Sequence, residues 1–460
     1  MPLILGTNSI KDTGYDVANS LRFDGSSDYL NRNQGTQTND TKYTFSAWVK
    51  RSGVLGSSSV NEVLLGSFTS FTDTGYIRFE DQNDNLQVYD KYGSTIDLNY
   101  QTNMKFRDPS AWYHIVVNAD STRSANQRCK IYVNGSEVSC SNTTDTGGTL
   151  GMKTSTDMRV GAINNSTGAS EYYFSGYMAE VYYIDGSGLD ASNFGEFNSD
   201  SPTIWQPKAY EGSFGNNGFY LDFENASSLG ADVSGNSNNW TANNIASTDQ
   251  STDTCTNNFA TINPLYAGLN ANESIAEGNL KGLNTGNGEN NYVSTIGVSS
   301  GKWYFEAKAN VAGDNYATIG IVATDSLLQV NGSWLGSTSD SFFYNENGNI
   351  GTNGSASTTG LASYTDDDII GVRVNLDDNE LHFYKNGTII TNTALSITAD
   401  KEYFFGGRVY SNATGWEFNF GSPPYTISSG NSDGNGYGNF EYAVPSGYYA
   451  LNTKNVATYG

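Results

Sequence analysis

The chain has 460 residues, which is long enough for two or three domains that each bury their own core. It carries 24 basic and 48 acidic residues, a net charge of −24, and a surface of that sign repels the phosphate backbone of a nucleic acid. No run approaches the about 18 to 20 apolar residues of a membrane-spanning helix. We therefore expect neither nucleic-acid binding nor membrane insertion.

The composition predicts an all-β protein. Aromatic residues make up 13% of the chain, and Gly, Asn, Ser and Thr fill the stretches between short apolar runs, which is typical of many strands joined by turns. No stretch shows helical periodicity. In chain order, the strands expected in the first 190 residues are 20–23, 43–49, 76–79, 86–89, 112–117, 130–133, 158–162 and 177–184.

The first residues, MPLILGTNSIKD, lack the basic start and the small-residue cleavage site of a secretory signal. We expect synthesis in a cytoplasm without export by a signal peptide. Residues 1–19 are assigned to a segment that docks to a partner.

Two of the three cysteines flank a predicted hairpin, CKIYVNGSEVSC. A two-residue turn at Asn134 and Gly135 places Cys129 opposite Cys140, and cross-strand Cα separations of roughly 4.5 to 5.5 Å suit a disulfide. The count also puts the pair at the wider, hydrogen-bonded type of site. The sequence leaves open whether the two cysteines are bridged, and Cys255 is expected to be a free thiol.

The middle of the chain, 191–292, is rich in Asn, Gly, Ser and Thr and has one clear strand at 218–223. It is either a linker or a set of strands flanking a second sandwich. We favour the strands, because structureless connections longer than about 15 residues are uncommon inside compact domains.

A second strand-dense block runs from 302 to 420. In GVRVNLDDNELHFYKNGTII, the turn at 377–379 and a second turn at Asn386-Gly387 predict three antiparallel strands in series.

The first block resembles laminin-G-like domains of the concanavalin-A-like superfamily through LRFDGSSDYL, YTFSAWVK, AWYHIVVNAD, IYVNGSEV and YFSGYMAEVYYIDG, in that order. The second resembles a SPRY domain through GKWYFEAK, ATIGIV, SWLG, DDDIIGVRVNLDDNELHFYKNG, YFFGGRV and EFNFGSPP. Both resemblances imply two packed antiparallel sheets. The expected organisation is therefore two jelly-roll-type β-sandwiches in tandem, at 20–190 and 293–424, with a connecting region 191–292 and a Gly/Tyr-rich C-terminal extension 425–460.

Members of both families usually bind ligands on loops or on one sheet face, so the resemblance implies binding. Sugars stack on exposed aromatic rings, and Trp334 in NGSWLG with Tyr344 beyond it are the candidate ligand-binding residues. Trp334 also fits a core position of the SPRY pattern.

Evidence for catalysis is weak in the sequence. Glycan cleavage needs two carboxylates about 5 to 10 Å apart, and the nearest candidates are Asp222 and Glu224, which would share one face of the strand at 218–223. A solvated strand face explains them as well. We expect no enzymatic activity.

Calcium is the one cofactor that the sequence allows. In ADVSGNSNNWT, Asp232, Asn236 and Asn238 offer oxygen ligands, as calcium prefers. The alternative is a polar turn without an ion, which we favour.

The order of the two domains, the first twenty residues and the closing FEYAVPSGYYALNTKN are similar to proteins of tailed bacteriophages from marine bacteria. That resemblance implies a virion-associated protein, in a fibre, an appendage or a capsid decoration, which contacts other virion proteins and binds a host-surface glycan. A homotrimer is one arrangement that it allows. The alternatives are a purely structural virion component and a polysaccharide hydrolase.

Overall fold

The computed structural model describes residues 14–53, 60–81, 83–153, 157–266, 272–327 and 333–460. The fold is all-β, as predicted, and it divides into two compact units, one ending at Thr256 and one starting at Asn257. Most of the predicted docking segment, residues 1–13, lies outside the described residues. Within the described ranges, no helix is long and apolar enough to cross a membrane.

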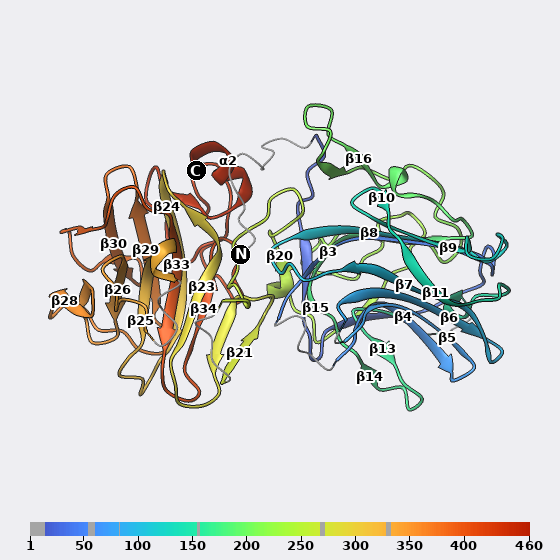
Figure 1. The fold of residues 1–460 in the computed structure, drawn as a ribbon, viewed down its shortest axis with the longest axis horizontal. Coiled ribbons are helices and arrows are strands. Elements are labelled where there is room, and N and C mark those ends of the chain that lie inside the picture. Colours follow the sequence, from blue (N-terminus) through green and yellow to red (C-terminus); the bar gives the residue numbers. More distant parts are fainter. Residues whose placement is uncertain (1–13, 54–59, 82, 154–156, 267–271, 328–332) are drawn as a thin grey trace. The chain divides into compact units, whose positions relative to one another are not determined.

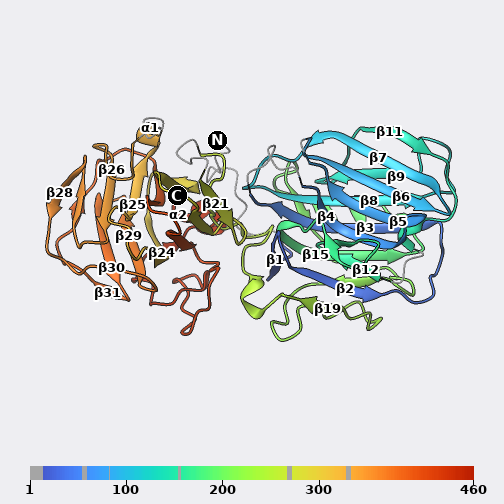
Figure 2. The same cartoon turned by 90° about the horizontal axis from the view of Figure 1, so that it is seen from below.

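The first unit is a sandwich of two eight-stranded antiparallel sheets (Figures 1 and 2). One sheet, here called sheet A, has the order β10-β9-β8-β3-β15-β1-β20, with β18 also paired to β15; sheet B has the order β11-β7-β6-β5-β4-β12-β2-β19. The strands are β1 (Ser20–Asp24), β2 (Tyr29–Asn33), β3 (Lys42–Arg51), β4 (Glu62–Ser70), β5 (Asp73–Phe79), β6 (Asn85–Tyr92), β7 (Thr95–Lys105), β8 (Trp112–Asp120), β9 (Cys129–Val133), β10 (Ser136–Glu137), β11 (Cys140–Asp145), β12 (Asp157–Val160), β15 (Ser175–Asp185), β18 (Phe219–Leu221), β19 (Thr241–Asn243) and β20 (Gln250–Ser251). Two short hairpins accompany them, β13 (Ile163–Asn164) with β14 (Ser170–Glu171), and β16 (Gly195–Phe197) with β17 (Trp205–Pro207).

Sheet A is buried on both faces. In β8, Ile115 and Val117 point into the core between the sheets, whereas Val116 packs outward against Phe194 and Trp205. This explains why β8 reads as a continuous apolar run, because an alternating pattern is expected only where one face meets water.

The cover over sheet A comes from the middle of the chain. Residues 191–256 lie in the first unit, and β18 pairs with β15 of sheet A. This segment was expected to flank the second sandwich, but the chain divides into its two units at 256/257. The difference arises because its few apolar residues pack on a sheet that is distant in sequence.

The hairpin β9–β10 has the predicted Asn-Gly turn, with Val133 opposite Ser136 and Asn134 at φ = 47°. Beyond Val138 the chain leaves sheet A, and Cys140 starts β11, where it lies opposite Thr102 of sheet B. The predicted cross-strand pairing of Cys129 with Cys140 is therefore wrong. Both are free cysteines, as is Cys255.

The second unit is also a sandwich of two sheets. A nine-stranded sheet has the order β21-β22-β34-β24-β29-β30-β31, with β32 paired to β30 and β35 to β24, and a six-stranded sheet has the order β23-β33-β25-β26-β27-β28. The strands are β21 (Glu273–Ala276), β22 (Lys281–Asn284), β23 (Asn290–Val298), β24 (Lys302–Asn310), β25 (Thr318–Ala323), β26 (Ser341–Asn345), β27 (Ile350–Thr352), β28 (Ser355–Thr358), β29 (Ile369–Asn375), β30 (Glu380–Lys385), β31 (Thr388–Ile389), β32 (Leu395–Ser396), β33 (Tyr403–Val409), β34 (Gly415–Asn419) and β35 (Tyr449–Ala450). Two helices are α1 (Thr324–Leu327) and α2 (Thr453–Tyr459). The three strands predicted in series are β29, β30 and β31.

The C-terminal extension packs on the outer face of the nine-stranded sheet. Phe440 and Ala450 are buried against Tyr304, and β35 runs parallel to β24. The buried carboxylate of Glu306 accepts hydrogen bonds from the backbone N–H groups of Glu441 and Tyr442, both at 2.9 Å. The extension is thus part of the second unit's fold.

Candidate ligand-binding cleft

A cleft of about 490 Å³ lies on the outer face of sheet B. Its floor follows from strand alternation: Ile77 and Val88 point into the core, so Tyr76 of β5 and Tyr89 of β6 point outward. The two tyrosines are opposite each other in the register, and their rings stack with centroids 4.9 Å apart.

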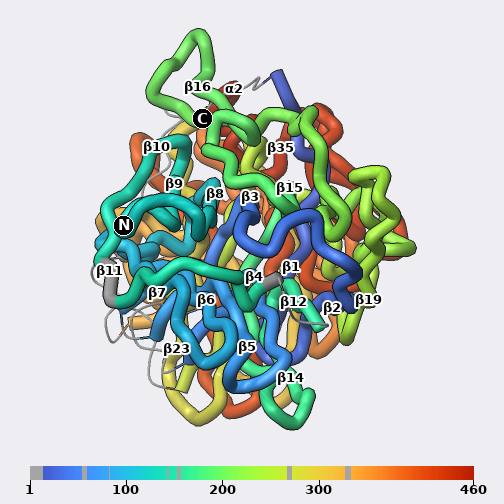
Figure 3. Tube along the Cα trace, turned by 90° about the vertical axis from the view of Figure 1, so that its right-hand side faces the viewer, coloured from blue at the N-terminus to red at the C-terminus, as the bar shows by residue number. Residues whose placement is uncertain are grey.

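The walls are two turns. On one side is the β4–β5 turn with Phe71, and on the other are the β13–β14 hairpin and Tyr172, which follows β14 directly; this hairpin is labelled beside β4 and β5 in Figure 1 and near β5 in Figure 3. The lining residues are Val63, Phe68, Phe71, Thr74, Tyr76, Arg78, Tyr89, Lys91, Ile163, Asn164, Asn165, Ser166, Glu171 and Tyr172.

Two aromatic rings in these walls are exposed. Phe71 is 73% exposed and Tyr172 is 38% exposed, and Phe71 contacts Phe68 edge-to-face with centroids 5.6 Å apart. A bare phenyl ring gains nothing from water, but its face suits the C–H groups of a sugar.

The backbone of Tyr172 is strained. Its φ is 58°, in the left-handed region that bulky residues avoid. The carbonyl of Tyr172 accepts the N–H of Val63 at 2.9 Å, which fixes this conformation against β4. Such strain is concentrated at ligand-binding and catalytic sites in proteins, and here it directs a ring into the cleft wall.

The floor supplies hydroxyl groups. Burial raises the pKa of Tyr76 to about 12, and it also raises the pKa of Tyr89. Both phenols are therefore protonated at neutral pH and can donate and accept hydrogen bonds. The guanidinium of Arg78 covers Tyr76, with its carbon 4.4 Å from the ring centroid.

Three charged side chains line the cleft. Arg78 donates to Gln87 at 3.0 Å, and a nitrogen of its guanidinium lies 3.8 Å from Glu80. Lys91 donates to the carbonyl of Phe71 at 2.7 Å, which holds the β4–β5 turn. Glu171 is the one carboxylate among the described lining residues, so no pair of acids faces this cleft.

This cleft was not predicted from the sequence. The sequence alternates so that Thr74, Tyr76 and Arg78 share one face of a strand. This alternation does not show whether that face is open to solvent or covered by other parts of the chain. The register of β5 with β6 and the position of the β13–β14 hairpin come only from the fold.

Asp222 and Glu224 do not share a strand face. β18 ends at Leu221, Phe223 has φ = 58°, and the N–H of Glu224 donates to Asp222 at 3.1 Å. The chain therefore turns between the two acids, and the arrangement expected of a hydrolase pair is not formed there.

Asp232, Asn236 and Asn238 lie in one loop, but they do not fit a calcium ion. Asp232 accepts the N–H groups of Tyr220, Ser234 and Asn238 at 2.7 to 3.0 Å. Asn236 donates its amide N–H groups to two carbonyls, and the side-chain oxygen of Asn238 accepts from Arg32 at 2.5 Å. The side-chain oxygens of Asp232 and Asn238 already accept hydrogen bonds, and the donor to Asn238 is the positively charged guanidinium of Arg32.

Of the two aromatic candidates, Tyr344 is fully buried in the second unit's core, between Tyr364 and Phe383. Its predicted ligand contact is therefore wrong, because β26 points it inward. Trp334 is half-buried, with the guanidinium of Arg408 4.9 Å from its ring centroid.

Trp334 lies near a pair of exposed aromatic rings that was not predicted from the sequence. Tyr316 and Tyr410 are 52% and 37% exposed, with ring centroids 5.1 Å apart. Buried Asp314 accepts the backbone N–H of Tyr316 at 2.9 Å and that of Tyr410 at 2.7 Å, and so ties their two loops together. Arg408 connects the pair to Trp334, since it also lies over the ring of Tyr316.

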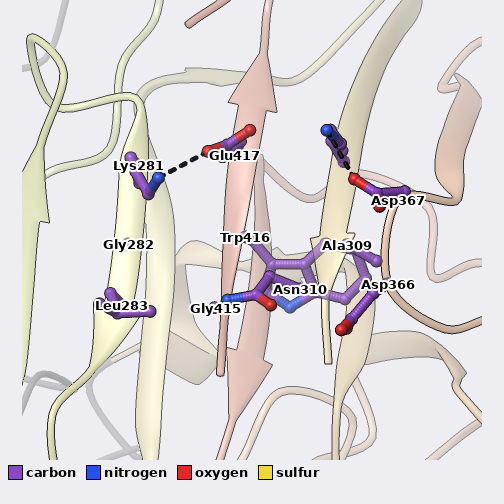
Figure 4. Close-up of a pocket in the computed structure, with 11 residues that line it drawn as sticks. Lys281, Gly282, Leu283, Ala309, Asn310, Asp366, Asp367, Gly415, Trp416 and Glu417 are labelled. Carbon is purple, nitrogen blue, oxygen red and sulfur yellow. Dashed lines mark ion pairs between the residues drawn. The ribbon is translucent and has the colours of Figure 1, made fainter. Parts of the chain in front are cut away.

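A smaller hollow of about 200 Å³ lies on the outer face of the nine-stranded sheet (Figure 4). Its charges are paired with one another: Lys281 contacts Glu417 at 2.8 Å, and Lys308 contacts Asp367 at 2.7 Å. Gly282 and Gly415 form part of its wall. The hollow has no exposed aromatic ring among its described residues.

Comparisons with known proteins identify two regions. Residues 24–187 match the family model described as the concanavalin A-like lectin/glucanases superfamily, and residues 302–423 match the SPRY domain. These matches support a laminin-G-like domain followed by a SPRY domain. The first description covers lectins as well as glucanases, so it identifies no enzymatic activity.

No curated protein matches the chain. Among solved structures, the SPRY domain of human HERC1 is similar at 20% identity, with 30% of this chain and 87% of that chain covered and a TM-score of 0.26. The TRIM65 PSpry domain is similar at 13% identity, with 35% and 91% covered and a TM-score of 0.28. A heptameric SAP-like pentraxin from Limulus polyphemus is similar at 14% identity, with 38% and 79% covered and a TM-score of 0.29.

Proposed function

We propose that this chain is a non-catalytic binding protein whose first unit recognises a surface glycan in the cleft on sheet B. The observation that carries the proposal is the pair of exposed rings, Phe71 and Tyr172, which line the same cleft as the protonated hydroxyls of Tyr76 and Tyr89. Sugars present C–H groups on one face and hydroxyls at the rim, and the cleft offers a partner for each.

We propose binding without catalysis because the described lining of the cleft holds a single carboxylate. Hydrolysis of a glycosidic bond uses two carboxylates on opposite sides of the bond, and the described lining has Glu171 alone. The pair considered from the sequence, Asp222 and Glu224, is separated by a turn. The cleft therefore retains a glycan rather than cleaving it.

The loop pair of the second unit, Tyr316 and Tyr410, is a second surface for recognition in this proposal. Two binding units on one chain raise the overall affinity for a repeating surface polymer, because the second contact becomes intramolecular. Weak single sites are then sufficient.

We place this binding on a virion of a tailed phage, where the chain would contact other virion proteins and meet the host surface. The support is the resemblance of the first twenty residues and of the closing segment to such proteins. A map of intact particles tests this part: density at the outer end of a tail or fibre favours host recognition, and density between capsid subunits favours the purely structural alternative.

The glycan proposal is tested on an array of bacterial surface oligosaccharides with the full chain. We expect Phe71→Ala and Tyr172→Ala each to weaken binding about tenfold, because each removes about 1 to 1.5 kcal/mol of stacking. Phe197→Ala is the matched control, since Phe197 is exposed to a similar degree but lies outside the cleft.

Two results would contradict the proposal. Equal loss in the control and the cleft variants would indicate a general surface effect, and shortening of the bound oligosaccharides during incubation would show a hydrolase.

A further inference from the structure

We infer that the cleft on sheet B selects an anionic glycan, one that carries carboxylate or sulfate groups. This inference rests on the proposed glycan binding and specifies its substrate class. It comes from the placement of Arg78 and Lys91 within the cleft.

The two cations flank the tyrosine floor along the strands. Lys91 lies opposite Thr74, Tyr89 opposite Tyr76, and Gln87 opposite Arg78, so the cations are at the two ends of a three-row ladder. Rows on one face are about 7 Å apart, which separates the cations by about 14 Å at the backbone. That span is longer than one sugar ring, so the pair can contact charges on different residues of an oligosaccharide.

Lys91 interacts electrostatically with the carboxylate of Asp73 but forms no ion pair with it. Its amine donates to the carbonyl of Phe71, and among the described residues no carboxylate forms an ion pair with it. The carboxylate of Asp73 accepts the backbone N–H of Gly93 and the hydroxyl of Thr72, which together with the positive charge of Lys91 lower its pKa. Two N–H groups of the Lys91 ammonium are thus available to a ligand.

Arg78 is held ready in the same way. Gln87 and the ring of Tyr76 fix its guanidinium, and Glu80 forms an ion pair with it at 3.8 Å, a distance too long for a hydrogen bond. A planar guanidinium binds carboxylate or sulfate oxygens through two parallel N–H groups.

The charge balance of the cleft is opposite to that of the chain. The described lining has two cations and one acid, Glu171, whereas the whole chain has 24 cations and 48 acids. On a protein with a net charge of −24, the surface as a whole repels an anionic polymer. The cations in the cleft therefore determine where such a polymer binds.

The test measures the affinity of the full chain for two matched pairs of oligosaccharides. The first pair is oligogalacturonate and its methyl ester, and the second is a sulfated galactan oligosaccharide and its desulfated form. We expect the charged member of at least one pair to bind about tenfold more tightly, which also distinguishes a carboxylate from a sulfate ligand.

Variants assign the effect to the two cations. Lys91→Gln and Arg78→Gln should each reduce the advantage of the charged probe several-fold, while Lys91→Arg retains it and Lys208→Gln, an exposed lysine outside the cleft, changes nothing. Raising the salt concentration from about 0.05 to about 0.5 M should weaken the binding of the charged probe more than that of the uncharged one. This measurement needs no variant.

The inference would be overturned if the charged and uncharged oligosaccharides of each pair bound with equal affinity, or if Lys91→Gln kept the full preference for the charged probe. Either result would leave the proposed glycan binding intact. Failure of all four probes would overturn it too. If the full chain bound no oligosaccharide on the array, or if Phe71→Ala left binding unchanged, the proposed function itself would be contradicted.

Discussion

At the tip of the β9–β10 hairpin, Gly135 has φ = 80°, and a Cβ added there would lie 2.3 Å from the indole of Trp205. We expect Gly135→Ala to lower the free energy of unfolding by about 3 kcal/mol, because it adds left-handed strain to a clash with a packed ring. Chemical denaturation measures the loss.

Gly93→Ala is its control, because Gly93 has φ = 55° and no atom within 4 Å of the added Cβ. It should cost about 1 kcal/mol, from strain alone. Equal losses in the two variants would mean that Trp205 does not cover the hairpin.

Single residues also show which features could be predicted from the sequence and which could not. The Asn-Gly turns were predictable, because two adjacent residues determine a type I′ turn. Tyr344 was misjudged, since alternation identifies the two faces of a strand without saying which one meets solvent. Asp222 and Glu224 were misjudged because Phe223 adopts a left-handed conformation that nothing in FYLDFEN indicates.

At the scale of elements, the C-terminal extension is bound to β24 through Glu306. Burial raises the pKa of this carboxyl from 4.5 to about 7, against the lowering effect of its hydrogen bonds to Glu441, Tyr442 and Tyr304. A folded-state pKa above the unfolded value favours folding while the group is protonated. The contribution is therefore full below about pH 4.5 and is lost as the pH rises through about 7.

Comparison of the wild type with Glu306→Gln isolates this effect. Gln does not titrate, so the unfolding free energy of the wild type should fall relative to the variant by about 3 kcal/mol between pH 4.5 and pH 8. A constant difference over this range would show that the carboxylate is ionised throughout. The cost of placing an amide opposite two N–H donors is independent of pH and does not affect the comparison.

Elements were predictable where their partners are near in sequence. Strands β29, β30 and β31 follow one another in the chain and were expected as a series. Strand β11, in contrast, pairs in sheet B, so counting outward from the hairpin turn wrongly paired Cys129 with Cys140. The cleft was missed for the same reason, because its walls at Phe71 and Tyr172 are a hundred residues apart.

At the scale of the whole molecule, each unit has its own core. The large clusters of buried side chains do not mix residues from before Thr256 with residues from after it. We expect calorimetry of the full chain to resolve two unfolding transitions, and a variant such as Gly135→Ala to shift one of them alone. A single transition that moves as a whole in this variant would contradict independent units.

The ends of the first unit meet. β1 pairs with β20, the N–H of Val17 donates to the hydroxyl of Thr256 at 3.1 Å, and buried Lys50 contacts Asp253 at 2.7 Å. A module whose entry and exit lie on neighbouring strands can be inserted into a surface loop of another protein without stretching either. Since the cleft is on sheet B, residues 14–256 are suited to transfer into another protein as a unit whose cleft stays clear of both junctions.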